Sequence, residues 1–365
     1  MNTIPNLASN SCCIVAEKEH KTTSGVPLLI KRVITIGTHN GRFHTDEVMA
    51  VTLLKILYGI LGVTVTVIRS RDPIELAKCD IVVDVGGGYD PSSRLFDHHQ
   101  KDCNEKFDNG EVKLSSAGMV WKEFGKIFID LHLTETFEKD EKQYIIDEAY
   151  LMIYEKIFKE IDAHDNGQDM IRPAFKRVDV LLYEINLSLG NTITKINFLK
   201  NVEGNDKFNM ACDFTKTMLM IHVMEILDLF IQEIKELPVL RKLYENRPCK
   251  FLLDIPENVT HNSKLISKVD EEAKELLFYV SENTNEKTKI KTWGMNTMKV
   301  DPKKKSFEIR KKLLSTEELE KLKELKELND EEFGKIKFIH KDLFTGSTTD
   351  HEVALKICRL SASKQ

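Results

Sequence analysis

Three short clusters of aspartate and histidine, each placed directly after an apolar run, constrain this chain more than any other feature. The middle cluster is Asp97-His98-His99, and the other two lie at residues 38–47 and 162–167. Side chains of this kind have few structural uses, and their surroundings lack the pattern of a solvated charged helix. We therefore expect the three segments to meet in one site built from the ends of several strands.

The first part of the chain alternates between strand-like and helix-like segments. β-Branched and apolar runs at 32–37, 63–68 and 80–86 predict buried strands. Apolar residues at helical spacing predict helices over 47–61, from 115 onward and over 141–161, with one short turn at 73–77. Such alternation favours an α/β fold with a parallel sheet and helices on both faces. Ligands bind beyond the carboxyl ends of such strands, which is where His39 and Asp84 would lie.

The length of 365 residues allows two or three domains. We expect a poorly ordered segment at 1–31, a first domain at 32–204 that closes near 179–189, and a connecting helix at 205–240 ended by Pro238. A smaller α/β C-terminal domain would follow at 241–365. In it the sequence predicts strands at 276–281, 288–293 and 335–340, and a solvated helix at 315–333.

Composition sets looser limits on partners and compartment. The net charge of −5 does not indicate nucleic-acid binding, although a local basic groove is compatible with it. Seven scattered cysteines are typical of reduced thiols, so we expect an intracellular protein of cytoplasm, nucleus or mitochondrion. Because no apolar run reaches the roughly 20 residues that span a bilayer, we expect no membrane partner.

The ligand chemistry of the clusters indicates divalent metal ions. Carboxylates and imidazoles are ligands of hard and borderline divalent ions, and the lack of cysteine argues against a structural zinc site. The donors are too many for one ion, so we expect two ions, with Asp84 as the bridging carboxylate. Two ions about 3.5–4 Å apart can activate a water and clamp a phosphoryl oxygen together. The three glycines after Asp84 would let the backbone turn sharply there.

Each of these residues also has an ordinary structural explanation. Asp46 and Glu47 can simply favour the N-terminus of the following helix, and Asp162 and Asp165 can do the same kind of capping. Asp84 alone can be a turn residue. Taken together, ionisable clusters at the ends of predicted strands and helices favour a metal site, because such clusters mark functional positions.

The same segments resemble a known group of enzymes, the DHH phosphoesterase superfamily, which includes manganese-dependent pyrophosphatases, the RecJ exonuclease and oligonucleotide phosphatases. The match is closer to the family named for melanocyte proliferating gene 1. The resemblance covers most of the chain from Val33 and is carried by residues 36–47, 80–87, 89–91, 96–100, 113–118 and 161–167. It implies a DHH-like catalytic domain with a mostly parallel sheet, a C-terminal substrate-binding domain, and 3′-to-5′ RNA exonuclease activity in nucleus and mitochondrion.

The resemblance also implies roles for individual residues. One ion, most simply Mn²⁺ with Mg²⁺ as the alternative, would bind His39, His44 and Asp84. The second would bind a set of Asp46, Asp84, His98 and Asp165, with Asp162 as a further candidate. His99 would sit by the scissile phosphate and Asp97 would orient the histidine pair from behind.

Two departures from the superfamily pattern stand out. The usual first motif has a carboxylate where this chain has His44. The C-terminal motif is usually rich in glycine with a basic residue, but residues 344–350 hold one glycine and no base. His340, Lys341 and His351 flank that loop.

Three functions stay open at this point. The first is a two-metal phosphoesterase acting on RNA or short oligonucleotides, with Arg69, Arg71 or Lys113 offsetting charge. The second keeps the ions but acts on a small phosphate ester or pyrophosphate, and the third is a non-enzymatic, metal-stabilised module. A peptidase is disfavoured, because the chain lacks a His-Glu-x-x-His helix. The native ion, the substrate polarity and the oligomeric state are not predicted.

Overall fold

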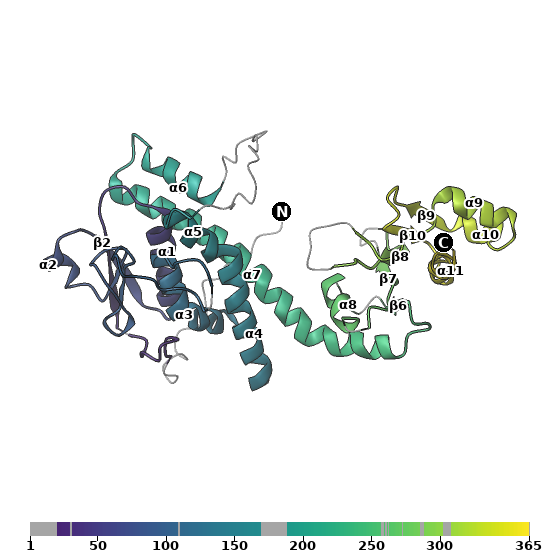
Figure 1. Cartoon of the computed structure of the whole chain (residues 1–365), viewed down its shortest axis with the longest axis horizontal. Helices are drawn as coiled ribbons and strands as arrows, with labels where there is room; N and C mark the ends of the chain where they lie inside the picture. Colours follow the sequence, from purple (N-terminus) through teal and green to yellow (C-terminus); the bar gives the residue numbers. More distant parts are fainter. Residues whose placement is uncertain are drawn as a thin grey trace. The chain divides into compact units, whose positions relative to one another are not determined.

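A computed structural model of the protein describes residues 20–29, 31–108, 110–168, 188–256, 259, 261, 263–271, 273–284, 288–301 and 308–364. The chain divides into two compact units, Met1–Phe230 and Ile231–Gln365. Figure 1 shows the elements of each unit along the chain. Among the described residues, no helix is long and apolar enough to cross a membrane.

The first unit is built on a five-stranded sheet of order β2-β1-β3-β5-β4. Its strands are β1 (Val33–Thr38), β2 (Thr64–Arg69), β3 (Ile81–Val83), β4 (Tyr89–Asp90) and β5 (Leu95–Phe96). All neighbouring strands are parallel except β4, which runs antiparallel to β5. The predicted α/β class with a mostly parallel sheet is therefore confirmed. The carboxyl ends of β1, β3 and β5 lie next to one another at one edge.

Two long helices cover this sheet, α1 (Thr45–Ile60) and α3 (Ser116–His132), which pack against each other and against the strands. Ile34 and Ile36 of β1 are fully buried. Gly37 points the opposite way, because side chains alternate along a strand. A Cβ on Gly37 would lie within 3.0 Å of Leu76 and Cys79, which lie in and after the short helix α2 (Pro73–Leu76).

The helix predicted at 141–161 forms three consecutive segments. They are α4 (Lys139–Ile153), a π-helical turn (Tyr154–Phe158) and α5 (Lys159–Asp165). A π turn holds one more residue than an α turn, and such turns are frequent at functional sites. The predicted close of the first domain at 179–189 falls largely outside the described residues. The chain is described again from Ser188, at the start of α6 (Leu189–Asn197).

The predicted connecting helix forms, but the prediction that it ends at Pro238 was wrong. Helix α7 (Gly204–Glu245) continues through Pro238, and the boundary between the two units falls inside it, between Phe230 and Ile231. A proline inside a helix removes one backbone hydrogen bond, at a cost of about 3 kcal/mol. The helix continues because Leu240, beyond the proline, is fully buried in the core of the second unit.

The second unit holds a sheet of order β6-β7-β8-β10-β9. Its strands are β6 (Leu252–Ile255), β7 (Phe278–Thr284), β8 (Lys291–Thr297), β9 (Ile336–Ile339) and β10 (Thr345–Thr348). Only the pair β6 and β7 is parallel. Leu252 packs with α11 (His351–Ser363), whereas Leu253 packs with α8 (Ser263–Val269), so helices cover both faces. The predicted smaller α/β unit is confirmed.

Two expectations outside the sheets need correction. The helix predicted at 315–333 breaks into α9 (Thr316–Glu324) and α10 (Asp330–Gly334). Lys326 has a left-handed φ of 58°, and Leu328 turns into the core. Residues 20–29 of the expected disordered segment instead pack on α3, where Thr23 N and Ser24 Oγ donate hydrogen bonds to Glu123. Residues 1–19 lie outside the described residues.

Candidate metal centre

The parallel sheet places three polar segments side by side. His39 follows β1, Asp84 follows β3, and Asp97 and His98 follow β5. Asp84 has a left-handed φ of 58°. Aspartate tolerates that conformation better than most residues. Three segments that are far apart in sequence therefore deliver side chains to one edge, as the sequence predicted.

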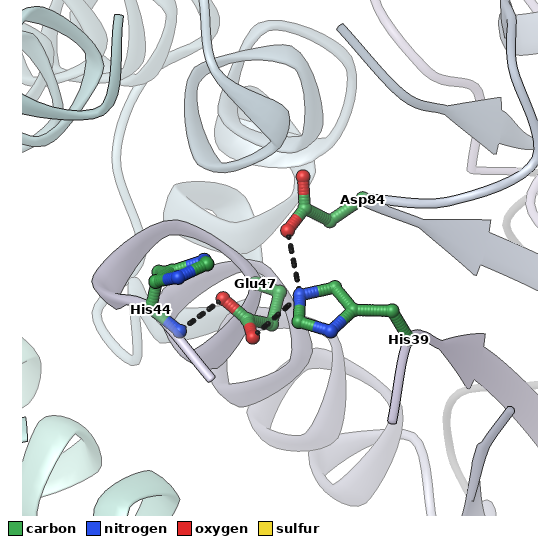
Figure 2. A group of neighbouring side chains, drawn as sticks. All are labelled: His39, His44, Glu47 and Asp84. Carbon is green, nitrogen blue, oxygen red and sulfur yellow. Dashed lines mark hydrogen bonds and ion pairs between the residues drawn. The ribbon is translucent and has the colours of Figure 1, made fainter. Parts of the chain in front are cut away.

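His39 is held between two carboxylates (Figure 2). Its Nε2 lies 2.9 Å from Glu47 Oε1 and 3.2 Å from Asp84 Oδ2. Its Nδ1 lies 3.0 Å from the carbonyl oxygen of Asn40, which can only accept, so Nδ1 carries a hydrogen. Burial lowers the pKa of His39, but hydrogen bonds to Asp84 and Glu47 outweigh it and raise the pKa to about 10. The Nε2 position thus calls for a proton or a cation between the carboxylates.

His98 occupies an equivalent position on the other side of Asp84. Its Nε2 lies 3.0 Å from Asp165 Oδ2, 3.4 Å from Asp84 Oδ1 and 3.7 Å from Asp46 Oδ2. None of these approaches has the geometry of a hydrogen bond. Burial lowers the pKa of His98, whereas Asp165 and Asp84 raise it to about 10. Three carboxylates therefore surround a nitrogen that is close to all of them and bonded to none.

Asp46 is the least satisfied group of the cluster. It is completely buried, and both of its side-chain oxygens lack a hydrogen-bond partner among the described residues. Burial, followed by repulsion from Asp84 and Glu47, raises its pKa well above the usual range. A buried carboxylate without a partner is strongly unfavourable, so a divalent cation is the simplest compensation. Oxygen and imidazole donors of this kind fit Mn²⁺ or Mg²⁺.

The two oxygens of Asp84 serve two different sets of donors. Oδ2 faces His39, whereas Oδ1 faces His98 and accepts a hydrogen bond of 3.2 Å from Ser116 Oγ. The two histidines beside its oxygens outweigh the effect of burial and lower the pKa of Asp84. Three groups of donors converge to within 4.8 Å: His39, His44, Glu47 and Asp84; Asp84, His98 and His99; and His44, Asp46 and Asp165. Two of these three groups share Asp84, and the cluster could hold a divalent metal ion.

His99 lies at the solvent side of the cluster, with 62% of its side chain exposed. Its Nδ1 lies 2.7 Å from Asp97 Oδ1, and the other oxygen of Asp97 accepts a 2.6 Å hydrogen bond from Gly87 N. The bond to Asp97 raises the pKa of His99. Asp97 thus fixes the ring and leaves Nε2 as the free nitrogen of an exposed imidazole.

The loop between His39 and His44 is fastened at several backbone atoms. Arg69 Nη2 donates to Gly41 O at 2.9 Å. Asn197 accepts from Phe43 N at 3.2 Å and donates to Phe43 O at 2.8 Å. Glu47 Oε2 accepts from His44 N at 2.7 Å. These bonds hold both histidines in place before any ligand arrives.

Several predicted residues lie away from the centre of the cluster. Asp162, predicted as a possible ligand, is buried beneath α3 instead, and its Oδ1 accepts from Ser115 N, Ser115 Oγ and Gly118 N. It therefore caps a helix, and a Cβ on Gly118 would lie 2.2 Å from its carboxylate. Arg69 packs its guanidinium over Phe208 and Phe43 at 4.6 and 5.4 Å.

The two remaining basic candidates are differently placed. Lys113 Nζ donates to His98 O at 3.3 Å, so it lies beside the cluster. Arg71 is exposed just beyond the end of β2. A role for either residue in offsetting charge stays a prediction.

Glu47 belongs to this cluster, although the sequence analysis did not predict it as a ligand. It was interpreted only as a charge favouring the N-terminus of α1, yet it is completely buried and its carboxylate links His44 to His39 (Figure 2). The signal was present in the sequence. Glu47 is the third residue of α1, the capping-box position, and the residue before that helix is the candidate ligand His44.

Comparison with known proteins gives one family match and several partial relatives. The family model described as Uncharacterised protein family (UPF0160), the MYG1 exonuclease family, matches residues 35–362. The chain is 44% identical to the MYG1 exonuclease of Mus musculus over 138 residues, which are 36% of this chain and 35% of that protein. It is 37% identical to a MYG1 protein of Schizosaccharomyces pombe over 152 residues, 40% of this chain and 45% of that one. The aligned part thus spans less than half of each relative.

Solved structures give weaker likenesses. A pGpG-specific phosphodiesterase of Vibrio superposes with a TM-score of 0.23 and 14% identity, covering 90% of this chain and 97% of that one. RecJ of Thermus thermophilus in complex with Mn²⁺ gives a TM-score of 0.24 and 12% identity, covering 91% and 52%. At such low scores neither likeness bears on function.

Proposed function

The chain belongs to the MYG1 exonuclease family, UPF0160, and from this premise we propose that it is a divalent-metal-dependent phosphoesterase that cleaves RNA or short oligonucleotides. Its mammalian relatives carry the name exonuclease. A 3′-to-5′ RNA exonuclease is the most specific form of the proposal. The charge and geometry of the Asp84 cluster support it independently of the names.

One observation carries the proposal, namely the shared position of Asp84 between two sets of donors. We assign His39, His44, Glu47 and Asp84 to one divalent ion. We assign His98 and the three carboxylates that lie within 3.7 Å of its Nε2, those of Asp46, Asp84 and Asp165, to the second. When bound, such a pair of ions polarises a phosphoryl oxygen and lowers the pKa of a water. Mn²⁺ is the proposed ion, with Mg²⁺ as the alternative.

The protein's own residues position the substrate. His99, with Nδ1 bonded to Asp97, presents Nε2 toward solvent, where it can donate a hydrogen bond or a proton to an oxygen of the scissile phosphate. Lys113 and Arg71 would add positive charge near that phosphate. The bonds that fasten the loop at 40–44 keep His39 and His44 fixed, so little reorganisation accompanies reaction.

The substitution Asp84→Asn tests the proposal. Asparagine tolerates the left-handed backbone at this position, so the fold should persist while the shared charge is lost. We expect manganese-dependent cleavage of a short RNA to fall at least about a thousandfold, which corresponds to roughly 4 kcal/mol. Asp213→Asn, an exposed carboxylate on α7, is the control and should keep full activity.

The same assay separates the competing substrates. Wild-type protein is compared on a pentaribonucleotide, on pyrophosphate and on a nucleoside monophosphate. Turnover of pyrophosphate alone would replace the nuclease by a small phosphatase. A fold stabilised by manganese without turnover of any of the three would leave only a metal-stabilised module.

Substrate binding by the second unit and an intracellular location, in cytoplasm, nucleus or mitochondrion, are further parts of the proposal. All five described cysteines are free thiols, which is consistent with a reducing compartment. Fractionation of cells with an antibody against the native protein tests the location.

A further inference from the structure

We infer that Arg42 and Phe198 form a platform on which one base of a single-stranded nucleic acid stacks beside the metal centre, an inference that rests on the proposed function and deepens it. The Arg42 Cζ lies 5.0 Å from the centroid of the Phe198 ring. Phe198 is 60% exposed, and Arg42 is exposed as well. An aromatic ring this accessible, with a cation over it, is not part of the core.

The platform is joined rigidly to the metal-binding loop. Phe198 directly follows α6 as its C-cap residue, and its backbone N–H donates to Lys195 O at 3.1 Å. The preceding residue, Asn197, makes both hydrogen bonds to the backbone of Phe43. Asn197 therefore fastens the end of α6 to the loop at 40–44. This contact fixes the backbone position from which the exposed Phe198 ring projects.

Arg42 lies close to the ligands along the chain. It is two residues from His44 and three from His39. Because consecutive Cα atoms are 3.8 Å apart, its Cα is within about 7.6 Å of that of His44. A nucleotide whose phosphate lies at the metal centre can therefore place its own base, or that of its neighbour, at the platform.

The charge around the ring suits a polyanion. Within the described part of the chain, Arg42 forms no ion pair, so its guanidinium is available to a phosphate or a base. Lys200 is exposed nearby in sequence, and Lys207 Nζ donates to Asn197 O at 3.2 Å, on the same helix end. Aromatic faces flanked by cations are the usual means of binding single strands, because every base offers a π face. Pyrophosphate offers none, so the platform would select nucleotides.

Binding to an intact oligonucleotide tests the inference without relying on cleavage. In the full chain carrying Asp84→Asn, a fluorescent pentaribonucleotide is titrated and compared with five versions, each lacking one base. We expect loss of one particular base to weaken binding about tenfold, in line with a single stacking contact. Phe198→Ala should weaken binding of the intact strand by a similar factor. In that variant, removal of the same base should cause no further loss of affinity.

Two matched variants complete the test. Each is added to the Asp84→Asn chain, which is the parent for these comparisons. Phe198→Trp should bind the strand as tightly as the parent. Ile74→Ala, which removes a 70% exposed side chain from α2, should leave the affinity unchanged. Unchanged binding in Phe198→Ala, a persisting sensitivity to the same base, or no binding by the parent would each overturn the platform. Binding without hydrolysis by the wild type would overturn the proposed function and leave the platform standing.

Discussion

Glu47 reaches both ends of the loop that joins the first two histidines, since Oε1 lies 2.9 Å from His39 Nε2 while Oε2 accepts the N–H of His44. This one buried carboxylate thus fixes the backbone of His44 and places a negative charge beside the imidazole of His39. Its position at the start of α1 explains why a helix-capping pattern and a metal-binding pattern coincide in this chain.

Glu47→Gln should separate these two roles. The amide keeps an oxygen that accepts from His44 N but loses the charge, so we expect α1 to stay capped. Because Glu47 is assigned as a ligand of one ion, Mn²⁺ affinity should fall by at least the roughly tenfold that is lost when a group behind a metal ligand is removed. Titration calorimetry measures the affinity. Glu318→Gln is the matched control, because Glu318 accepts from Ser315 N at the start of α9, in the second unit. Equal Mn²⁺ affinity in both variants would remove Glu47 from the site.

Asp162 should behave as a structural residue. All three of its donors bond to Oδ1, an oxygen that asparagine retains, so Asp162→Asn should keep activity and fold. Asp162→Ala leaves buried donors unpaired and should lower the free energy of unfolding by about 2–4 kcal/mol, measured by urea denaturation. Loss of activity in a well-folded Asp162→Asn protein would return this residue to the metal site.

Asp162 also gives a pH dependence with a definite sign. Burial raises its pKa to about 6, against the bonds from Ser115. In the unfolded chain an aspartate titrates near 3.9, so between those values the folded protein binds the proton more tightly. This contribution to stability is therefore present below about pH 4 and is lost as the pH rises to 6, by roughly 3 kcal/mol. The stability of Asp162→Asn should lack this component when both proteins are denatured across that range.

Divalent ions should stabilise the first unit. Because the oxygens of Asp46 have no hydrogen-bond partner in the described part of the chain, a cation that binds only the folded state should raise the melting temperature. At an Mn²⁺ concentration a hundred times the dissociation constant, the gain is about 2.7 kcal/mol. Differential scanning fluorimetry should show this shift for wild type, its reversal by EDTA, and its near absence in Asp84→Asn. A shift of equal size in that variant would place the ion elsewhere.

Arg69 and Arg71, which the sequence presents as equivalent bases, should differ. Arg69→Met keeps apolar packing on Phe208 but removes the bond to Gly41 O, so we expect a stability loss of about 1–2 kcal/mol and reduced turnover. Arg71→Met should leave stability unchanged, because that side chain is exposed. Thermal denaturation of the two variants tests whether Arg69 anchors the loop while Arg71 is only a surface charge. A lower melting temperature in Arg69→Met alone is the expected result.

Much of the site could be predicted because the chemistry is local in sequence. His39, Asp84 and His98 each follow a strand, and parallel strands bring their carboxyl ends together whatever the helices do. Helix ends were harder to predict. Pro238 signals a stop that the buried Leu240 overrides, whereas 315–333 looks continuous although Leu328 pulls the chain inward. The role of Asp162 depends on a distant contact with Ser115, which no local pattern encodes.

The π turn at Tyr154–Phe158 determines the directions in which the side chains of the following helix, α5, point. Each residue of a helix advances the side-chain direction by about 100°, so one inserted residue decides which side of α5 meets the sheet edge. With the extra residue, Asp165 reaches His98. Shortening this turn by a single residue would carry Asp165 away from the histidine while leaving every side chain of the cluster chemically intact. A change in the length of this turn would then disrupt the cluster as thoroughly as the loss of Asp165 itself.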